Sequence, residues 1–364
     1  MTIPGQPQTE ASAGPEGGSR PAAFPVLEVA VVIVTYRSAS FTIACLQSLA
    51  QERSNPVLHI RAIVVDNASG DLVQISRAVE ERQWSSWITL LESPKNGGFS
   101  YGNNLGIECA CAAGPPSYLF LLNPDTEVRP GAVAALVKFL EAHPEAGIAG
   151  PSFETGKGDD WRIAFRFPTL LGELELGLKL GLATRLLRRW AVVRTMGDRS
   201  EAVDWVSGSS MMIRPEVFAT IGGMDENYFL FFEETDLCWR AQRAGFTTWY
   251  VPESRIMHIG GDTTNVRKRR PPCWFESRRR YLAVTHGLAQ AMLIDIVAVG
   301  AHLLGALKGL IQGRTHSGPP HFIRDLIHHS IIWSRNRAVP PIRSPIVAGA
   351  CAPKSSGVSV QLRT

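Results

Sequence analysis

The sequence predicts an α/β fold with a mostly parallel, doubly wound sheet, and three observations support this prediction. Short apolar runs rich in β-branched residues have the length of buried strands. Between them lie segments in which apolar residues recur at the three- and four-residue spacing of amphipathic helices. The chain has 364 residues, of which 45% are hydrophobic, so it can bury a large core in one or two domains.

Strands and helices are predicted to alternate through about residue 150, as in a parallel sheet. The predicted strands cover residues 29–34, 60–65, 87–91 and 118–122. The predicted helices cover residues 43–50, 72–79, 104–112 and 133–140. Ser40 is expected to cap the first helix, residues 96–99 to form a turn, and Pro130 to open the last helix.

Beyond residue 150 the pattern is less regular. Residues 152–202 contain a loop at 156–160 and an apolar, basic segment at 170–194, before compact α/β character returns at 203–260. Residues 278–314 are predicted to be helical. Their longest uncharged run, 296–307, is too short for a membrane span, so we expect a helix that lies on a membrane or packs on the domain.

The domain boundaries follow from these patterns. Residues 1–24 are rich in Pro, Gly, Ala and Ser and are predicted to be disordered. Residues 25–265 form the predicted catalytic domain, and 266–337 a helical extension that contacts either the membrane or the domain. Residues 338–364 are predicted to be a flexible tail.

Composition restricts the partners and the compartment. The net charge of +4 is too small to argue for nucleic acid. Basic residues cluster at 185–189, 267–270 and 278–280, which suits phosphates or an anionic membrane, with a solvated face as the alternative. The six cysteines include no CxxC pair, and the N-terminus shows no signal-peptide pattern. Both observations predict reduced thiols in a cytoplasmic protein.

Asp125 is the first candidate for chemistry. It follows the apolar run 118–122 and is held on a turn stiffened by Pro124 and Pro130. Ligands of open α/β sheets bind at strand ends, and a single fixed carboxylate there suits a divalent metal shared with a phosphate. The alternative is a turn residue that caps the following helix.

A nucleoside pocket is the second candidate. Thr35 and Tyr36 end the first predicted strand, and Asp66 and Asn67 end the second, so the four residues meet at one sheet edge. Tyr36 offers an aromatic face, and Asp66 can accept a hydrogen bond from a base or a ribose. Ordinary turn chemistry is the alternative for residues 66–70.

The third candidate is the stretch 96–106, with four glycines and three asparagines. Glycines allow close backbone approach to a ligand, and asparagines such as Asn96 and Asn104 bind sugar or phosphate oxygens. A merely flexible loop is the alternative.

Two further candidates lie nearer the C-terminus. Four apolar residues precede Glu233 and Glu234, and such surroundings raise a carboxyl pKa and suit a general base. Acids that complement a helix dipole are the alternative, and Asp236 is expected to pair with Arg240. His258 precedes a glycine pair and a basic run, which suits a diphosphate or metal contact, although lone histidines are more often structural.

Together these motifs resemble the family 2 inverting glycosyltransferases, in particular a bacterial rhamnosyltransferase-like branch. The match covers roughly residues 28–265. Its motifs are residues 32–36, 64–69, 96–99, 103–106, 121–125, 204–208, 222–226, 233–237 and 258–261.

The resemblance implies a GT-A fold that uses a nucleotide-sugar donor and Mg²⁺ or Mn²⁺. Glu234 matches the catalytic base, at a position where Asp is frequent, and Asp125 and His258 match the metal or diphosphate contacts. Asn123 replaces the first acid of the family's DxD-type motif, so the donor diphosphate is expected to complete the metal's coordination. The implied donor-binding residues are Thr35, Tyr36, Asp66, Asn67, Asn96, Gly98, Asn104, Asn123, Trp205 and Gly208.

The implied reaction transfers a sugar, rhamnose from dTDP-rhamnose in this branch, onto a cell-envelope or polyprenyl-linked glycan. The expected location is the cytoplasm, with peripheral contact at the cytoplasmic face of the inner membrane as one possibility. UDP-GlcNAc and UDP-galactose are alternative donors. A sugar-phosphate nucleotidyltransferase and a non-catalytic glycan-binding protein are the alternatives from other classes.

Overall fold

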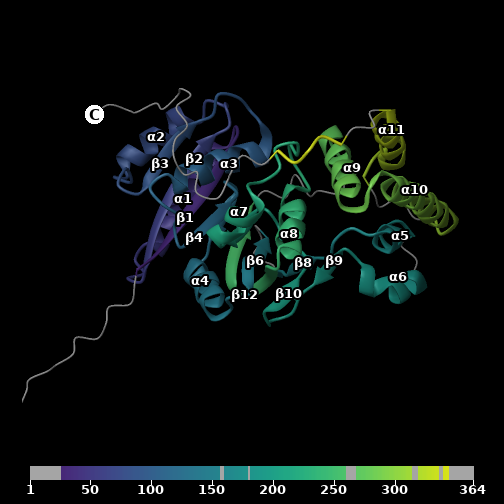
Figure 1. The fold of residues 1–364 in the computed structure, drawn as a ribbon, viewed down its shortest axis with the longest axis horizontal. Helices are drawn as coiled ribbons and strands as arrows, with labels where there is room; N and C mark the ends of the chain where they lie inside the picture. The colour runs from purple at the N-terminus through teal and green to yellow at the C-terminus, as the bar shows by residue number, and fades with distance from the viewer. Residues whose placement is uncertain are drawn as a thin grey trace, which may run out of the picture.

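The protein is an α/β domain with helices gathered at one side (Figure 1). The computed structural model describes residues 26–155, 160–178, 181–259, 268–313, 319–335 and 339–343. Its main sheet has the strand order β10-β12-β6-β11-β4-β1-β2-β3. This arrangement confirms the predicted α/β class with a mostly parallel sheet.

The first half of the sheet is parallel and consists of the four strands expected from the sequence. They are β1 (Leu27–Thr35), β2 (Leu58–Asp66), β3 (Ile88–Glu92) and β4 (Tyr118–Leu122). The helices between them are α1 (Ala39–Glu52), α2 (Leu72–Glu81) and α3 (Gly98–Cys111). Residues of β1 and β4 are buried on both faces, which is why their sequences read as unbroken apolar runs.

The second half introduces antiparallel pairing. Its strands are β5 (Thr126–Val128), β6 (Ala146–Thr155), β10 (Glu201–Val203), β11 (Ser210–Ile213) and β12 (Thr247–His258). Its helices are α4 (Ala132–Ala142), α7 (Pro215–Ile221) and α8 (Glu233–Arg243). The strand β11 runs antiparallel to β4 and β6, while β12 is parallel to β6 and antiparallel to β5. A short strand β7 (Asp160–Trp161) pairs with β6, and β8 (Ile163–Phe165) pairs with β9 (Val193–Thr195).

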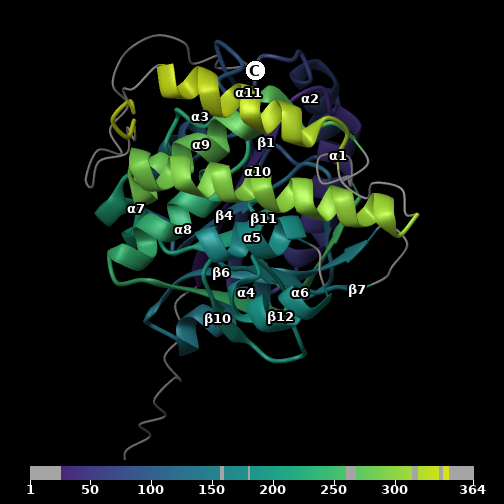
Figure 2. The ribbon, with the colours of Figure 1, turned by 90° about the vertical axis from the view of Figure 1, so that its right-hand side faces the viewer.

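The remaining helices lie together at the right of Figure 1 and are seen face-on in Figure 2. They are α5 (Leu170–Leu178), α6 (Gly181–Leu187), a 3₁₀ turn η1 (Arg188–Trp190), α9 (Pro272–His286), α10 (Leu288–Ile311) and α11 (Phe322–Arg335). Two glycines allow α5 and α10 to cross closely. A β-carbon on Gly305 would lie 2.3 Å from the Gly177 carbonyl oxygen, so this crossing excludes any larger residue there.

Buried ion pairs connect these helices, and they correct one interpretation of the sequence. Arg278, Arg279 and Arg280 are all buried, so they form neither a solvated face nor a phosphate site. Arg278 and Arg279 each bind Asp295 of α10, with nitrogen–oxygen distances of 2.6 and 2.8 Å. Buried charges are stable in a protein only when paired in this way.

Three local expectations also need correction. The first helix begins at Ala39 and its N-cap position is Ser38, so Ser40 is not the cap. The helix expected at residue 104 begins at Gly98, which makes part of the expected 96–99 turn helical. Residues 339–343, expected in a flexible tail, bond to the core, since Arg280 donates to the Pro340 carbonyl at 3.0 Å. The expectations for residues 1–24, 156–159, 260–267 and 344–364 lie outside the described residues.

Candidate functional site

Several of the predicted site residues lie at the edge of the sheet where its parallel strands end. Thr35 and Asp66 are paired neighbours at the ends of β1 and β2, and Asp125 lies just beyond β4 in the same sheet. The turn between β4 and Asp125 is fixed to the segment that precedes β11, because the Asn123 N–H donates to the Ser209 carbonyl at 2.9 Å. This is the edge at which open α/β sheets bind ligands.

Asp66 is 1% exposed, and its carboxylate is shaped by its own turn. One oxygen accepts hydrogen bonds from the Ser69 N–H at 2.9 Å and the Ser69 hydroxyl at 2.6 Å. The other accepts from the Gly70 N–H at 3.0 Å. These bonds hold the carboxylate in one orientation while leaving acceptor capacity for a ligand.

Tyr36 and Thr35 differ in what they offer a ligand. Tyr36 is 43% exposed, with the Arg37 guanidinium 5.2 Å from its ring centre, so its aromatic ring is accessible. Thr35 is buried, and its hydroxyl donates to Asp71 at 2.7 Å. Thr35 therefore shapes the pocket from behind rather than presenting its hydroxyl to the pocket.

Asp71 is a residue that the sequence motifs missed. Besides Thr35 it accepts a hydrogen bond from the Ser38 N–H at 2.8 Å, so it ties the turn after β1 to the start of α2. The available signal was its place at the N-terminus of a helix, directly after the 66–70 turn. Its carboxylate accepts both of these hydrogen bonds from the turn after β1 and makes no cap hydrogen bond to α2.

The glycine- and asparagine-rich stretch connects the nucleoside side of the site to the loop before α8. The Asn67 side-chain amide donates to the Gly98 carbonyl at 3.0 Å, and the Asn96 side chain accepts from the Gly98 N–H at 3.1 Å. The next N–H, of Phe99, donates to the Phe229 carbonyl at 2.7 Å. Asn67, Asn96 and Gly98 thus form one continuous bonded unit with residue 229.

Asn104 is buried, and its contacts differ from those of a ligand-binding residue. Its amide nitrogen donates to the Met224 carbonyl at 2.9 Å and to Glu226 at 3.1 Å. Its oxygen accepts from the Met224 N–H at 2.9 Å. Both amide donors are therefore used inside the protein, and Asn104 positions the turn that leads to residue 229. Direct donor binding by Asn104 is not supported by this geometry.

Asp125 and His258 lie side by side. The His258 Nε2 atom is 3.3 Å from an Asp125 carboxylate oxygen. The backbone explains this proximity, because His258 of β12 pairs with Thr126 of β5 and the Ile259 N–H donates to the Asp125 carbonyl at 2.9 Å. Residues from two distant parts of the chain are thereby brought to one point.

This pair has the composition of a partial metal site. Carboxylate oxygen and imidazole nitrogen are common ligands of divalent cations, and the Asn123 side-chain oxygen is buried without a hydrogen-bond partner. Among the described residues, no group of three or more His, Cys, Asp or Glu side chains could hold a metal. The residues fit a cation that is completed by a ligand such as a diphosphate.

The two glutamates that begin α8 differ in accessibility. Glu233 is buried, while Glu234 is half-buried. Burial raises the pKa of Glu234 to about 7, and the backbone N–H groups of Glu234, Thr235 and Gly208 oppose that rise. Burial, together with the neighbouring Glu234, raises the pKa of Glu233 well above its ordinary value. The Glu234 residue is partly exposed, although its Oε2 oxygen is buried without a hydrogen-bond partner, and a carboxyl group with a pKa of about 7 suits a general base.

The two remaining predicted residues belong to one segment, and one of them contacts Glu234. A β-carbon on Gly208 would lie 3.2 Å from the Glu234 β-carbon, so the glycine leaves just enough space for this side chain. The Trp205 ring stacks on Phe165 at 4.0 Å between ring centres, and its indole N–H donates to the Arg166 carbonyl at 3.0 Å. The indole is therefore held in a fixed position.

Helix α9 supports the loop that precedes Glu233, which the sequence motifs did not indicate. The Ser277 hydroxyl donates to the Leu230 carbonyl at 2.9 Å, and the Tyr281 ring lies 5.7 Å from the Phe232 ring. Phe231 and Phe232 both have left-handed backbone conformations, with φ of 72° and 66°. Strained residues of this kind persist only where the surrounding structure holds them.

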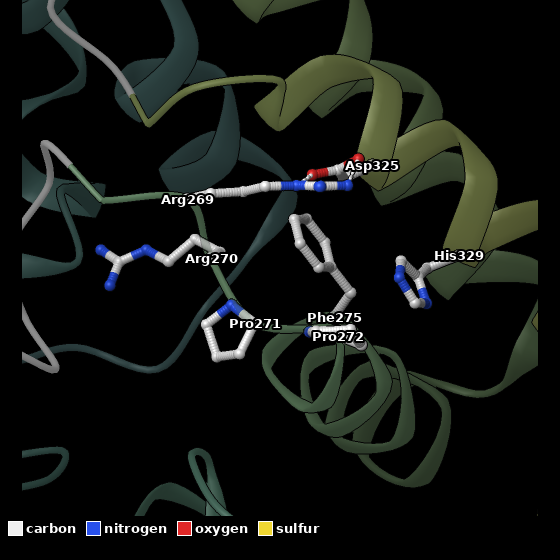
Figure 3. Close-up of a pocket in the computed structure, with 7 residues that line it drawn as sticks. All are labelled: Arg269, Arg270, Pro271, Pro272, Phe275, Asp325 and His329. Atoms are coloured by element: carbon white, nitrogen blue, oxygen red, sulfur yellow. Dashed lines mark hydrogen bonds and ion pairs between the residues drawn. The ribbon is translucent and has the colours of Figure 1, made fainter.

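A separate cavity of about 240 Å³ lies between the start of α9 and α11 (Figure 3). Arg269 crosses it to make two hydrogen bonds to Asp325, at 2.7 and 2.8 Å, while Phe275 and His329 stack below. None of the predicted site residues lines it. Arg269 thus joins the start of α9 to α11, and the Arg270 guanidinium lies 5.8 Å from the centre of the Trp274 ring.

Comparison with known proteins gives one family match. Residues 25–283 match the family described as glycosyltransferase like family 2. An N-acetylglucosaminyl-diphospho-decaprenol L-rhamnosyltransferase of Mycobacterium tuberculosis is 30% identical over 245 residues, which are 64% of this chain and 76% of the relative. A dTDP-rhamnosyl transferase of Shigella flexneri is 24% identical, over 64% of this chain and 69% of the relative.

A solved structure shares the fold. The structure of GalNAc-T7 with UDP, GalNAc and Mn²⁺ superposes with a TM-score of 0.51 at 15% identity. The match covers 87% of this chain and 59% of that chain.

Proposed function

Because the chain belongs to glycosyltransferase family 2, we propose that it transfers rhamnose from dTDP-rhamnose to a lipid-linked or other cell-envelope glycan. The proposed sugar follows the two relatives named as rhamnosyltransferases, and the nucleotide follows the dTDP in the name of the Shigella flexneri relative. The proposed acceptor follows the decaprenol-linked N-acetylglucosamine in the name of the mycobacterial relative.

One observation carries the catalytic proposal. Glu234 is a half-buried carboxylate whose pKa is raised to about 7, and it lies at the start of α8 against Gly208. A carboxyl group with this pKa is ionised in a large fraction of molecules at neutral pH. Its carboxylate is also basic enough to accept the proton of a hydroxyl group. Glu233 is buried, and burial together with the neighbouring Glu234 raises its pKa well above the ordinary value, so Glu233 is the poorer candidate for this role.

The proposed reaction is a single displacement. Glu234 removes the proton from an acceptor hydroxyl, and that oxygen bonds to the anomeric carbon of the donor sugar. The bond between that carbon and the diphosphate breaks, and the nucleoside diphosphate leaves with the bonding electrons. The configuration inverts, so one base suffices and no carboxylate nucleophile is needed.

Asp125 and His258, with the Asn123 side-chain oxygen, are the residues that would hold a divalent cation. When bound, Mg²⁺ or Mn²⁺ supplies positive charge beside the diphosphate. The structural neighbour named with UDP and Mn²⁺ supports this proposal by its fold alone.

We propose that Tyr36 and Asp66 contact the nucleoside, with Asn67, Asn96 and Gly98 forming the wall toward the diphosphate. The accessible Tyr36 ring and the oriented Asp66 carboxylate support these roles. Trp205 and Gly208 are proposed to border the sugar and the acceptor. Gly208 contacts Glu234, the proposed catalytic base, and Trp205 is held in the same segment.

A lipid-linked acceptor implies work at a membrane surface. We propose that the enzyme acts on the cytoplasmic side of the membrane, where nucleotide sugars are available. The apolar surface of the helical extension supports this location.

The test is donor use by the purified full-length chain. Hydrolysis of dTDP-rhamnose, UDP-GlcNAc and UDP-galactose is measured with Mn²⁺ and with Mg²⁺, with release of the nucleoside diphosphate as the readout. Preferential hydrolysis of dTDP-rhamnose is expected, and Glu234→Gln should remove it. Preference for another donor would overturn the sugar assignment. Pyrophosphate release from a nucleoside triphosphate and a sugar phosphate would instead indicate a nucleotidyltransferase. Absence of donor binding would indicate a non-catalytic protein.

A further inference from the structure

The solvent-facing side of α10 is mostly apolar. The exposed large residues of this helix are Leu288, Met292, Leu293, Ile296, Leu303, Leu304, Leu307, Leu310 and Ile311. The only other exposed side chains on it are Ala289 and Gln290, and of its two charged residues Asp295 is buried and Lys308, in the last turn, is only partly exposed. A surface helix of a globular protein normally carries polar residues on this side.

The opposite side of α10 is packed on the protein. Ala291, Ile294, Ala298 and Ala301 are buried, and Asp295 is buried in its ion pairs with the arginines of α9. The helix is long and apolar enough to cross a membrane by length and composition. Its buried side and its ionic anchor instead keep it lying along the surface of the domain, with one apolar side uncovered.

Neighbouring helices extend this surface. In Figure 2, α10 lies across the face of the molecule, with α11 on one side and α5 and α6 on the other. Leu176 of α5 and Leu186 of α6 are exposed beside it. Arg185, Arg188 and Arg189, on α6 and η1, are also exposed. A broad apolar surface is thus bordered by positive charge.

We infer that α10, α5 and α6 form a membrane-docking face that takes an anionic phospholipid bilayer. The apolar residues would enter the boundary between headgroups and acyl chains, as in helices that lie in the membrane plane. The three arginines would contact anionic headgroups. A helix of 24 residues is about 36 Å long, so the contact would fix the orientation of the whole domain on the membrane.

A second copy of the chain is the competing occupant of the same face. Charge favours the bilayer, because a symmetric pair would bring the arginine clusters of α6 and η1 of both copies to one interface. Like charges oppose such an interface, whereas anionic lipid attracts them. This inference extends the proposed function, since a lipid-linked acceptor lies in a bilayer, but its test does not measure sugar transfer.

The test is flotation of the full-length chain with vesicles. Vesicles of phosphatidylcholine with one quarter phosphatidylglycerol are compared with vesicles of phosphatidylcholine alone. We expect the chain to float with the anionic vesicles, and at least tenfold less chain to float for Leu303→Glu/Leu307→Glu. The control Val57→Glu/Val73→Glu adds the same charge at exposed apolar positions just before β2 and on α2, two elements that lie far from α10 in Figure 1, and should float normally. Arg185→Gln/Arg188→Gln should reduce binding to anionic vesicles at least threefold without changing binding to neutral ones.

Three outcomes would overturn the inference. They are the absence of flotation by the unaltered chain, equal flotation of the Leu303/Leu307 variant, and a dimer in solution that this variant separates without any vesicle binding. Hydrolysis of the donor in solution, measured on the same samples, separates these outcomes from failure of the proposed function. A variant that still hydrolyses donor is folded, so its loss of flotation reports on the surface.

Discussion

The carbonyl oxygen of Phe229 occupies the place where a β-carbon on Gly98 would lie. The distance between that oxygen and the constructed β-carbon is 2.2 Å, far inside contact distance, and Gly98 has a φ of +88°. The same carbonyl accepts the Phe99 N–H at 2.7 Å. One glycine thus joins the start of α3, on the proposed donor side, to the 229–232 loop that precedes α8 and Glu234.

Gly98→Ala should separate these two parts of the site. The added methyl group must displace the 229–232 loop, and the left-handed backbone costs a further 1–3 kcal/mol, roughly. We expect kcat/KM for transfer to fall at least tenfold and the free energy of unfolding to fall by about 2 kcal/mol. Steady-state kinetics and urea unfolding measure the two effects.

Gly131→Ala is the matched control. Gly131 has a φ of +82°, but nothing lies within 4 Å of its constructed β-carbon. This variant should lose a similar amount of unfolding free energy through backbone strain, and its kcat/KM should stay unchanged. Equal activity of the two variants would contradict the coupling through Phe229.

Glu234→Gln should abolish transfer and leave donor affinity nearly unchanged. Glutamine keeps the shape of the side chain but cannot accept the proton of the acceptor hydroxyl. We expect kcat to fall at least a hundredfold, as loss of a general base commonly costs roughly 10²–10⁴. Calorimetric titration with the donor checks the affinity. Near-normal turnover would remove Glu234 from the role of base.

The raised pKa of Glu234 also predicts a dependence on pH. Activity requires the ionised form, so kcat/KM should rise with pH and level off above about 7. Between the ordinary glutamate pKa and about 7, the folded state holds a proton that the unfolded state has released. The contribution of this group to stability therefore falls as pH rises through that window. Glutamine does not titrate, so the Glu234→Gln variant lacks this pH-dependent loss of stability. Its urea unfolding midpoint, relative to that of the native chain, should therefore rise as the pH is raised from 5 to 8.

The sequence predicted the strands of the parallel half because their burial on both faces leaves a direct signal in unbroken apolar runs. It also predicted that Asp125, His258 and Glu234 belong to one site, but through family motifs rather than local pattern. The proximity of His258 to Asp125 depends on pairing between β5 and β12, whose residues are more than a hundred positions apart. No local rule reports such a pairing.

The arginines of α9 show the opposite case. Three consecutive arginines read as a solvated or phosphate-binding cluster, because burial of charge is rare without partners. Their partners are single acids in distant segments, Glu173, Asp225 and Asp295, none of which is distinctive in the sequence. The internal partners of Asn104, at 224 and 226, could not be predicted for the same reason, since they are defined only by the fold.

Asp125→Asn should remove the metal dependence of donor binding. The substitution keeps the size of the side chain and deletes the one anionic ligand that the 123–125 turn offers. We expect donor affinity in Mn²⁺ to fall at least tenfold and affinity in EDTA to stay unchanged. Calorimetry under the two conditions gives the comparison.

Glu127→Gln provides the control for this experiment. Glu127 lies two residues further on in β5 and is opposed by Met257 rather than His258 in the sheet, so it does not join the Asp125–His258 pair. Its loss should leave metal-dependent binding intact. If Asp125→Asn binds donor in Mn²⁺ as tightly as the native chain, the cation is held elsewhere.

The buried pair between Arg280 and Asp225 should be among the strongest single contributions to stability in the extension. Both side chains are almost fully buried, at 4% and 0% exposed, and the Arg280 Nε atom donates to the carboxylate at 2.8 Å. Removing one partner leaves a buried charge without compensation, which typically costs about 3–5 kcal/mol. Arg280→Met should lower the free energy of unfolding by that amount in urea denaturation.

The partly exposed pair of Arg61 and Glu28 is the comparison, because its side chains are 25% and 37% exposed. Arg61→Met should cost less than about 1 kcal/mol. Asp225 lies between the residues that Asn104 bonds, so Arg280→Met should also lower kcat more than it raises KM for the donor. Equal loss of stability in the two arginine variants, with unchanged kcat in both, would contradict this role of α9. It would show that α9 neither anchors the turn at 224–226 nor supports the 229–232 loop that precedes Glu234.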